Sequence, residues 1–417
     1  MPRFLLAVWL ALAALPSAAA RAQPTIHMSE REAVSRALES APLVIRSHRE
    51  RDVIATERIG ARALLPANPV ASATIGHRRD DSASVPPATG VEWGVRLEQM
   101  IEVAGQRGAR MREADRALGV ASEAERLARL DTRAEARAAY VSLQVARAQV
   151  EAAARRLALG DQLLQAARAR VKAGAASDIE LHLAEVERGR FEHEHVEAQL
   201  AVGEAERALR LVTGVGGDVS IEPSTPLTSP PPLQGDLHVL VEHAIAARAE
   251  RRVVKAAVAH VDASVSRLSR ERAPNPTLYV DAQSQQPGQL YVGGGVALPL
   301  PLWRRNQGEL ARAHAERRRL EAEDSLLVRE IEQQVAAALH TLEARQAEEA
   351  LWSERIVPSA EANVELVRAG WLGGKLDLFR VVQVAREAAD ARRRQLEVLG
   401  DLWRARIELD RATGSES

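Results

Sequence analysis

Residues 91–99 of the chain read Val91-Glu92-Trp93-Gly94-Val95-Arg96-Leu97-Glu98-Gln99. Apolar and polar side chains alternate through this stretch, and a period of two residues predicts a β-strand with one apolar and one polar face. A second alternating stretch, from Val70 to about His77, precedes it across a turn at 78–90. The two stretches predict a hairpin over about 69–101, with lipid or a protein core on one face and water on the other.

The same pattern returns in the second half of the chain. Alternation runs over 278–283 and again over 290–298, and it predicts a second hairpin over about 276–300. Pro299 and Pro301 end that hairpin, because proline removes a donor from the strand ladder.

Long helical runs surround the predicted hairpins. They cover about 106–172 and about 307–368, and bends are expected at Gly160 and Pro358. At ~1.5 Å per residue the first run is ~100 Å long, which exceeds what a globular domain needs. The segment 29–65 is predicted as one helix that opens the first half.

Several landmarks occur twice in the same order. Asn68-Pro69 recurs as Asn275-Pro276, Val171-Lys172-Ala173-Gly174 as Val367-Arg368-Ala369-Gly370, and Thr213-Gly214 as Thr413-Gly414. Such repetition predicts a duplicated architecture. The expected limits are a first repeat at 23–214 with its tip at 173–178, a proline-rich linker at 215–235, a second repeat at 236–414 with its tip at 369–377, and a tail at 415–417.

Residues 1–22 have the composition of a secretory signal peptide. Arg3 precedes the apolar run Phe4 to Leu15, and a small-residue stretch ends at Ala22. The apolar run is too short to cross a bilayer, and no run of 18 apolar residues follows it. We expect export of the chain; the alternative is a buried N-terminal helix.

Composition excludes several classes of protein. The 417 residues include 56 basic and 57 acidic side chains, so the chain lacks the basic excess of a nucleic-acid-binding protein. No cysteine is present, which excludes disulfides, thiol nucleophiles and a lipid anchored on an N-terminal cysteine. With 3% aromatic residues, the core must come from close helix packing.

The two hairpins lead to a prediction about assembly. Each strand has the length that crosses a bilayer when tilted. Four strands do not close a barrel, and an open sheet edge in lipid leaves backbone groups unsatisfied at several kcal/mol each. The chain must therefore oligomerise if these strands lie in a membrane: two copies give a narrow eight-stranded barrel, and three give a twelve-stranded barrel with a lumen. The alternative is a soluble helical protein with two surface hairpins.

The order of these features resembles the TolC-type outer-membrane efflux family over nearly the whole mature chain. The segments that carry the resemblance are Val296 to Trp303, Arg368-Ala369-Gly370 followed by Leu376-Asp377-Leu378, and Ala405 to Gly414. The resemblance implies a mainly α fold with a small β part. It also implies a homotrimer with a twelve-stranded outer-membrane barrel in lipid, continued by a long α-helical barrel across the periplasm.

One segment suggests a branch of this family. The run Leu97 to Arg107 resembles the strand-to-helix segment of outer-membrane members of cobalt-zinc-cadmium efflux systems. That resemblance implies divalent metal ions as cargo, with an inner-membrane RND pump and a periplasmic adaptor (membrane fusion protein) as partners. Drug efflux and type I secretion channels share the fold and stay open as alternatives.

The predicted site residues lie at the two helical tips. The family's tips dock adaptor hairpins, and the matching positions are Gly174, Ala175, Asp178, Gly370, Trp371 and Leu372, of which Trp371 and Leu372 are expected to be exposed. Asp377 matches an acidic position that narrows the pore in some members, and a ring of three carboxylates favours cations. The next acidic position of the family is Arg380 here, which allows an Asp377–Arg380 pair. Without the family, these tips read as ordinary helix-hairpin turns.

The sequence gives little indication of a catalytic site or of a bound metal ion. The densest cluster, Glu192-His193-Glu194-His195, places its imidazoles two residues apart, on nearly opposite sides of a helix. We therefore expect no enzyme, no cofactor and no metal site. The rival to a transport channel is a soluble periplasmic coiled-coil scaffold or adaptor.

Overall fold

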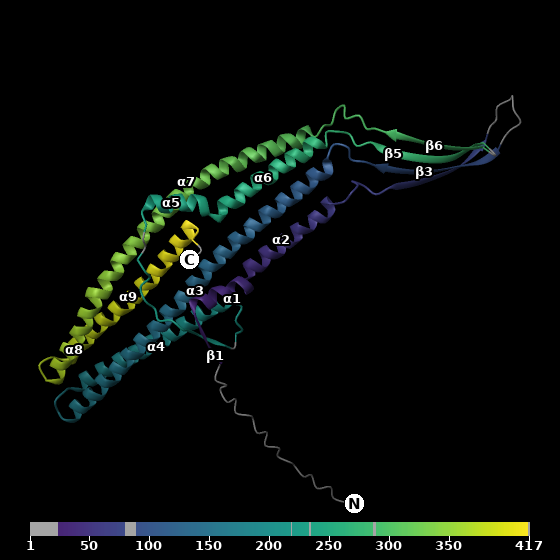
Figure 1. The fold of residues 1–417 in the computed structure, drawn as a ribbon. Coiled ribbons are helices and arrows are strands. Elements are labelled where there is room, and N and C mark those ends of the chain that lie inside the picture. Colours follow the sequence, from purple (N-terminus) through teal and green to yellow (C-terminus); the bar gives the residue numbers. More distant parts are fainter. Residues whose placement is uncertain (1–23, 80–88, 218, 233–234, 287–288, 416–417) are drawn as a thin grey trace, which may run out of the picture.

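The computed structural model describes residues 24–79, 89–217, 219–232, 235–286 and 289–415. The predicted signal peptide, most of the 78–90 turn and part of the 285–289 turn lie outside these ranges, as do parts of the linker and the tail. Figure 1 shows an elongated molecule in which long helices run side by side, with a β-sheet at one end and two helical tips at the other.

The chain forms sixteen elements within the described residues. In the first half they are β1 (Thr25–Met28), α1 (Glu30–Ser40), α2 (Pro42–Ala61), β2 (Val70–Arg79), β3 (Thr89–Met100), α3 (Gln106–Lys172), α4 (Asp178–Thr213) and β4 (Ser220–Pro223). In the second half they are α5 (Leu237–Ala247), α6 (Ala249–Arg270), β5 (Thr277–Gln286), β6 (Gln289–Ala297), α7 (Gln307–Leu351), the π-helix η1 (Trp352–Ile356), α8 (Val357–Leu372) and α9 (Leu378–Thr413).

The fold is mainly helical with a small β part, as predicted. Four antiparallel strands form one sheet in the order β2-β3-β5-β6, so the two hairpins meet where β3 pairs with β5. The helices that lead into and out of the sheet follow the same order, because α3 packs against α2 and α6, and α6 packs against α7. β2 with α2 forms one edge of this layer, and β6 with α7 forms the other.

The pairing register sorts the side chains of the sheet onto two faces. Val95 lies opposite Ala73 on one side and Ala282 on the other, and Leu97 lies opposite Ala71 and Val280. Cross-strand partners share a face, so these residues belong to one apolar surface. Val95 and Leu97 are 49% and 50% exposed, so no other part of the described chain covers that surface.

The helices of the first half differ from the sequence prediction at two places. The helix expected over 29–65 is two helices, because Ala41 is extended ahead of Pro42, which begins α2. The capping box of Ser29 and Glu32 is confirmed. At Gly160 the prediction of a bend was wrong: α3 continues through it, and an added Cβ would lie 2.8 Å from the ring of Phe191, so glycine permits close helix packing.

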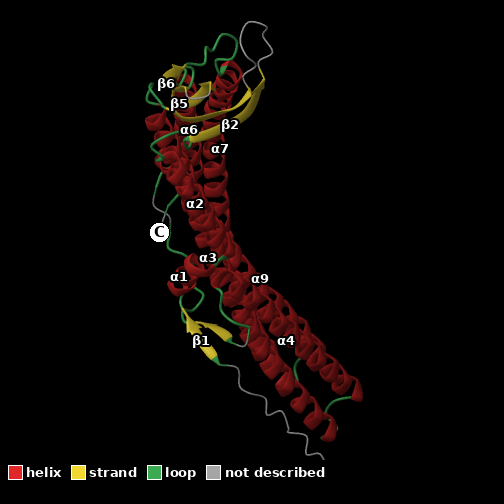
Figure 2. Cartoon of the chain, turned by 90° about the vertical axis from the view of Figure 1, so that its right-hand side faces the viewer, coloured by secondary structure: helices red, strands yellow, loops and turns green. Residues whose placement is uncertain are grey.

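The proline-rich linker contains a strand that the sequence did not reveal. β4 pairs in parallel with β1, with Ile26 opposite Ile221, and Figure 2 shows this pair beside the helices between the sheet and the tips. Tyr140 of α3 ties the pair to the helices, since its hydroxyl donates to the Met28 carbonyl at 3.0 Å. Among the described helices, none combines the length and apolar content required to cross a bilayer.

Candidate functional site at the helical tips

Two helix reversals form the end of the molecule opposite the sheet (Figure 1). In the first, Gly174 has φ 70° and the Ala175 amide donates to the Arg170 carbonyl at 2.8 Å. In the second, Gly374 has φ 71° and the Lys375 amide donates to the Gly370 carbonyl at 2.9 Å. Both turns use a left-handed glycine to satisfy the last helix carbonyls, so they are the same turn built twice.

The structure corrects the position of the second turn. The sequence comparison matched Gly370 to Gly174, but the structural counterpart of Gly174 is Gly374, four residues later. Gly370 lies inside the last turn of α8, where an added Cβ would be 2.7 Å from a methyl carbon of Leu376. The error arose because an Ala-Gly dipeptide resembles the first turn more closely than the residues that adopt its conformation.

Trp371 is buried, and the prediction that it is exposed was wrong. Its exposed fraction is 1%, within a cluster that includes Leu163, Leu378 and Val381. The Arg170 guanidinium lies 5.4 Å from the centre of the indole ring and donates to the Trp371 carbonyl at 2.8 Å. Trp371 therefore joins α8 to α3 inside the chain.

Leu372 is 57% exposed beside this buried tryptophan. Ala175 is exposed in the first turn, and Asp178 is the exposed first residue of α4. Of the predicted docking residues, these three and Gly174 lie on the outer surface of the tips.

Asp377 caps a helix instead of pairing with the Arg380 side chain. Its Oδ1 accepts from the Arg380 backbone amide at 2.9 Å, while the Arg380 guanidinium donates to Gln383 at 3.3 Å. A side-chain oxygen at the N-cap satisfies one of the free amides of the first turn, which explains the preference for this geometry. Both side chains remain exposed at the start of α9.

Two exposed apolar residues at the tips were missed in the sequence. Ile179 is 78% exposed and Phe379 is 65% exposed, and each is the second residue of its returning helix. They are 200 residues apart, as are Gly174 and Gly374. Alignment of the returning helices on Thr213-Gly214 and Thr413-Gly414, which have the same separation, was the signal that would have identified them.

A buried ion pair joins the two returning helices behind the tips. The Glu187 side chain on α4 is 2% exposed, and Arg386 on α9 binds both of its oxygens, with the Nε contact at 2.9 Å. Hydrogen bonding to Glu187 raises the pKa of Arg386, so this guanidinium carries its charge throughout the working pH range. Arg190 adds a longer contact at 3.8 Å.

The histidine cluster on α4 is dispersed. His193 approaches Glu197 at 3.3 Å, and His195 contacts Gln199 at 3.0 Å, so the two imidazoles have separate partners. In the ranges given above, no group of three or more metal-ligating side chains is arranged to hold an ion.

Comparison with known proteins relates the first half of the chain to a family of known proteins. The family model described as "Outer membrane efflux protein" matches residues 34–215. The cobalt-zinc-cadmium resistance protein CzcC of Cupriavidus metallidurans is 29% identical over 328 residues, which are 75% of each chain. Residues 34–215 therefore match the outer membrane efflux protein family, and CzcC is similar over three quarters of the chain.

Solved structures of TolC-type channels share the fold over almost the whole chain. The channel protein CusC superposes with a TM-score of 0.74 at 16% identity, over 94% of this chain and 93% of its own. A membrane protein from Pseudomonas aeruginosa gives the same TM-score at 20% identity, over 94% and 95%. At 16% and 20% identity, these likenesses show that the chain shares the fold of these membrane proteins over almost its whole length.

Proposed function

We propose that three copies of the chain form the exit duct of a tripartite efflux system for divalent heavy-metal ions. The observation that carries the proposal is the four-stranded sheet, which has an uncovered apolar face and two unpaired edges. Three copies of four strands make a closed sheet of twelve, in which every edge is paired and the apolar face meets lipid.

The tips are the surface that we assign to a periplasmic adaptor. Ile179, Phe379 and Leu372 expose apolar surface at the end farthest from the sheet, around the turns at Gly174 and Gly374. Apolar residues exposed together at one end of a molecule are typical of a protein interface. An inner-membrane RND pump would deliver the cargo through that adaptor.

The cargo is inferred from the CzcC relative, whose name records resistance to cobalt, zinc and cadmium. Deletion of the gene is expected to lower the tolerated concentrations of these ions several-fold and to leave drug tolerance unchanged, with the wild-type gene restoring growth. Copper and common drugs complete the growth test. If the deletion strain became sensitive to drugs alone, the protein would be a drug channel instead. If the purified protein were a monomer that stays in solution without detergent, it would be a soluble scaffold.

Asp377 is proposed to narrow the entrance with a ring of three carboxylates, beside Arg380. Asp377→Ser retains a capping oxygen and removes the charge, whereas Asp377→Ala removes both. In planar bilayers we expect the serine variant to lose cation preference without loss of helix stability, while the alanine variant also loses about 1 kcal/mol of tip stability. Unchanged ion selectivity in the serine variant would refute a role for this carboxylate in the pore.

A further inference from the structure

The junction between the sheet and the long helices is built twice from the same elements. Gly105 before α3 has φ 71° and ψ 26°, and Asn306 before α7 has φ 56° and ψ 25°. Each helix then begins with a glutamine whose Oε1 accepts a backbone amide two residues earlier: Gln106 from Ala104 at 2.8 Å, and Gln307 from Arg305 at 2.6 Å. The two junctions are 201 residues apart and share one backbone conformation.

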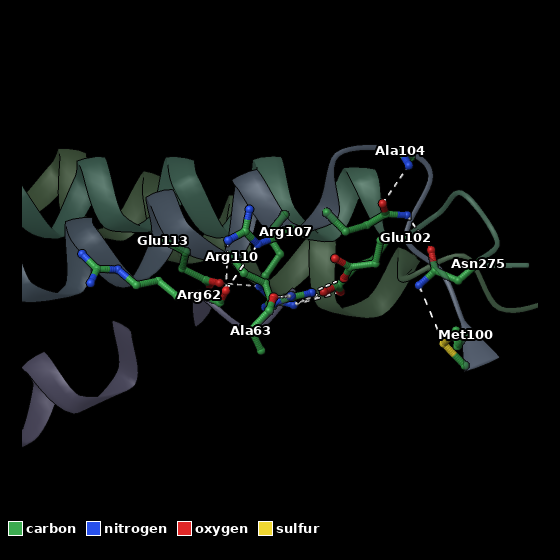
Figure 3. Close-up of polar contacts among 12 residues, drawn as sticks. Arg62, Ala63, Met100, Glu102, Ala104, Arg107, Arg110, Glu113 and Asn275 are labelled. Carbon is green, nitrogen blue, oxygen red and sulfur yellow. Dashed lines mark hydrogen bonds and ion pairs between the residues drawn. The ribbon is translucent and has the colours of Figure 1, made fainter. Parts of the chain in front are cut away.

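A residue from the other half of the chain completes the first junction. Gln106 Nε2 donates to Asn275 Oδ1 at 2.8 Å, and the Ile101 amide donates to the Pro276 carbonyl at 2.9 Å. Figure 3 shows Asn275 beside Ala104 and Met100, where the chain passes from β3 to α3. Gln106 is only 1% exposed, so the Asn-Pro dipeptide ahead of β5 covers the start of α3.

At the second junction, no described residue of the same chain takes the place that Asn275 has at the first. Gln307 is exposed, and its Nε2 donates to the Trp303 carbonyl at 2.7 Å. The other Asn-Pro dipeptide of this kind, Asn68-Pro69, lies ahead of β2 at the opposite edge of the sheet. Asn68 is exposed and makes no hydrogen bond to any described residue. One edge of the sheet therefore carries Gln307 and the other carries Asn68, which together correspond to the Gln106–Asn275 pair of the first junction.

The layer of helices ends at the same two edges, with α2 at one edge and α7 at the other. α2 packs on α3, and three of its apolar residues remain exposed: Ile45 at 47%, Val53 at 64% and Ile59 at 75%. The arrangement that places β5 and α6 beside β3 and α3 within the chain would place β2 and α2 of a second copy beside β6 and α7. A head-to-tail contact of this kind closes into a ring when its rotation permits.

We infer that Gln307 of one copy donates a hydrogen bond to Asn68 of the next copy, which reproduces between chains the Gln106–Asn275 contact within the chain. This inference rests on the proposed trimer and identifies the polar contact that sets its register at the neck, where the sheet meets the helices. Pro69 follows Asn68 as Pro276 follows Asn275. The backbone contact of the first junction is not part of this inference, because the Leu302 amide, the counterpart of the Ile101 amide, already donates to the Leu300 carbonyl at 2.9 Å.

Cysteine cross-linking tests the contact directly, since the natural chain has no cysteine. Full-length protein carrying Asn68→Cys and Gln307→Cys, purified in detergent and treated with a short bis-methanethiosulfonate, should give covalent dimers and trimers on a denaturing gel. Each single variant should remain monomeric on the gel. The matched pair Gln106→Cys and Asn275→Cys should link within one chain, which peptide mass spectrometry detects, and should migrate as a monomer.

Mass measurement in detergent separates this inference from the proposed assembly. A trimer whose Asn68→Cys and Gln307→Cys variant forms no more interchain product than the single variants would overturn the contact and leave the trimer intact. A protein without trimer mass would overturn both. Alanine variants at the same positions give a second test: each should speed trimer dissociation about fivefold, and the double variant should add nothing further, because both remove one hydrogen bond. Additive effects would refute direct contact.

Discussion

Replacement of Arg386 by alanine is expected to destabilise the contact between α4 and α9 by about 3–5 kcal/mol, the cost of leaving a buried charge without its partner. The Glu187 side chain is 2% exposed, and among the described basic residues only Arg190, at 3.8 Å, would still pair with it. Hydrogen exchange of residues 178–213 and 378–413 measures the free energy of local opening. The expected result is loss of protection in both helices near the tips.

The reverse replacement provides the control for this prediction. Glu187→Gln leaves the Arg386 charge unpaired, but that side chain is 42% exposed and can turn into water, so we expect a cost of about 1 kcal/mol. The double replacement Glu187→Leu with Arg386→Met should be close to neutral, because an apolar pair of similar volume needs no counter-charge. Equal costs for the two single variants would show that burial of the carboxylate does not control this contact.

Replacement of Trp371 by alanine should cost about 3–5 kcal/mol at the tip, since it removes the largest buried side chain of that cluster. The Arg170 guanidinium also loses the ring that it covers. We expect faster hydrogen exchange at the ends of α3 and α8 and reduced efflux in cells.

Leu372→Ala is the matched control, because the neighbouring side chain is 57% exposed and its truncation leaves the core intact. Its effect on tip stability should stay within about 0.5 kcal/mol. If Trp371→Ala kept full protection of the tip and lost only adaptor binding, the tryptophan would be a docking residue after all.

Local sequence patterns were sufficient to predict most of the helices and strands. Alternation over 91–99 predicted a strand with an apolar face, and the structure forms β3 at Thr89–Met100 with that face exposed. Ser29 and Glu32 predicted a helix start, and the capping box is present. These features depend on residues a few positions apart, so the sequence alone contains the information.

Contacts between distant segments were not predictable in the same way. Nothing near β4 indicates that Ile221 pairs with Ile26, almost 200 residues earlier, because the partner of a short strand is chosen by the surrounding packing. From the sequence, a tryptophan beside a turn can be either exposed or buried. Trp371 is buried because α3 packs against it.

By itself, the sequence determined that this protein is a long helical chain with two amphipathic hairpins, since hydrophobic period and turn residues act over short distances. Tertiary structure alone decided which glycine reverses the second tip, which face of α8 is buried, and that Gln106 meets Asn275 while Gln307 and Asn68 stay exposed at opposite edges. The physical reason is that burial and pairing are properties of a surface, and each of these surfaces is assembled from segments far apart in the chain.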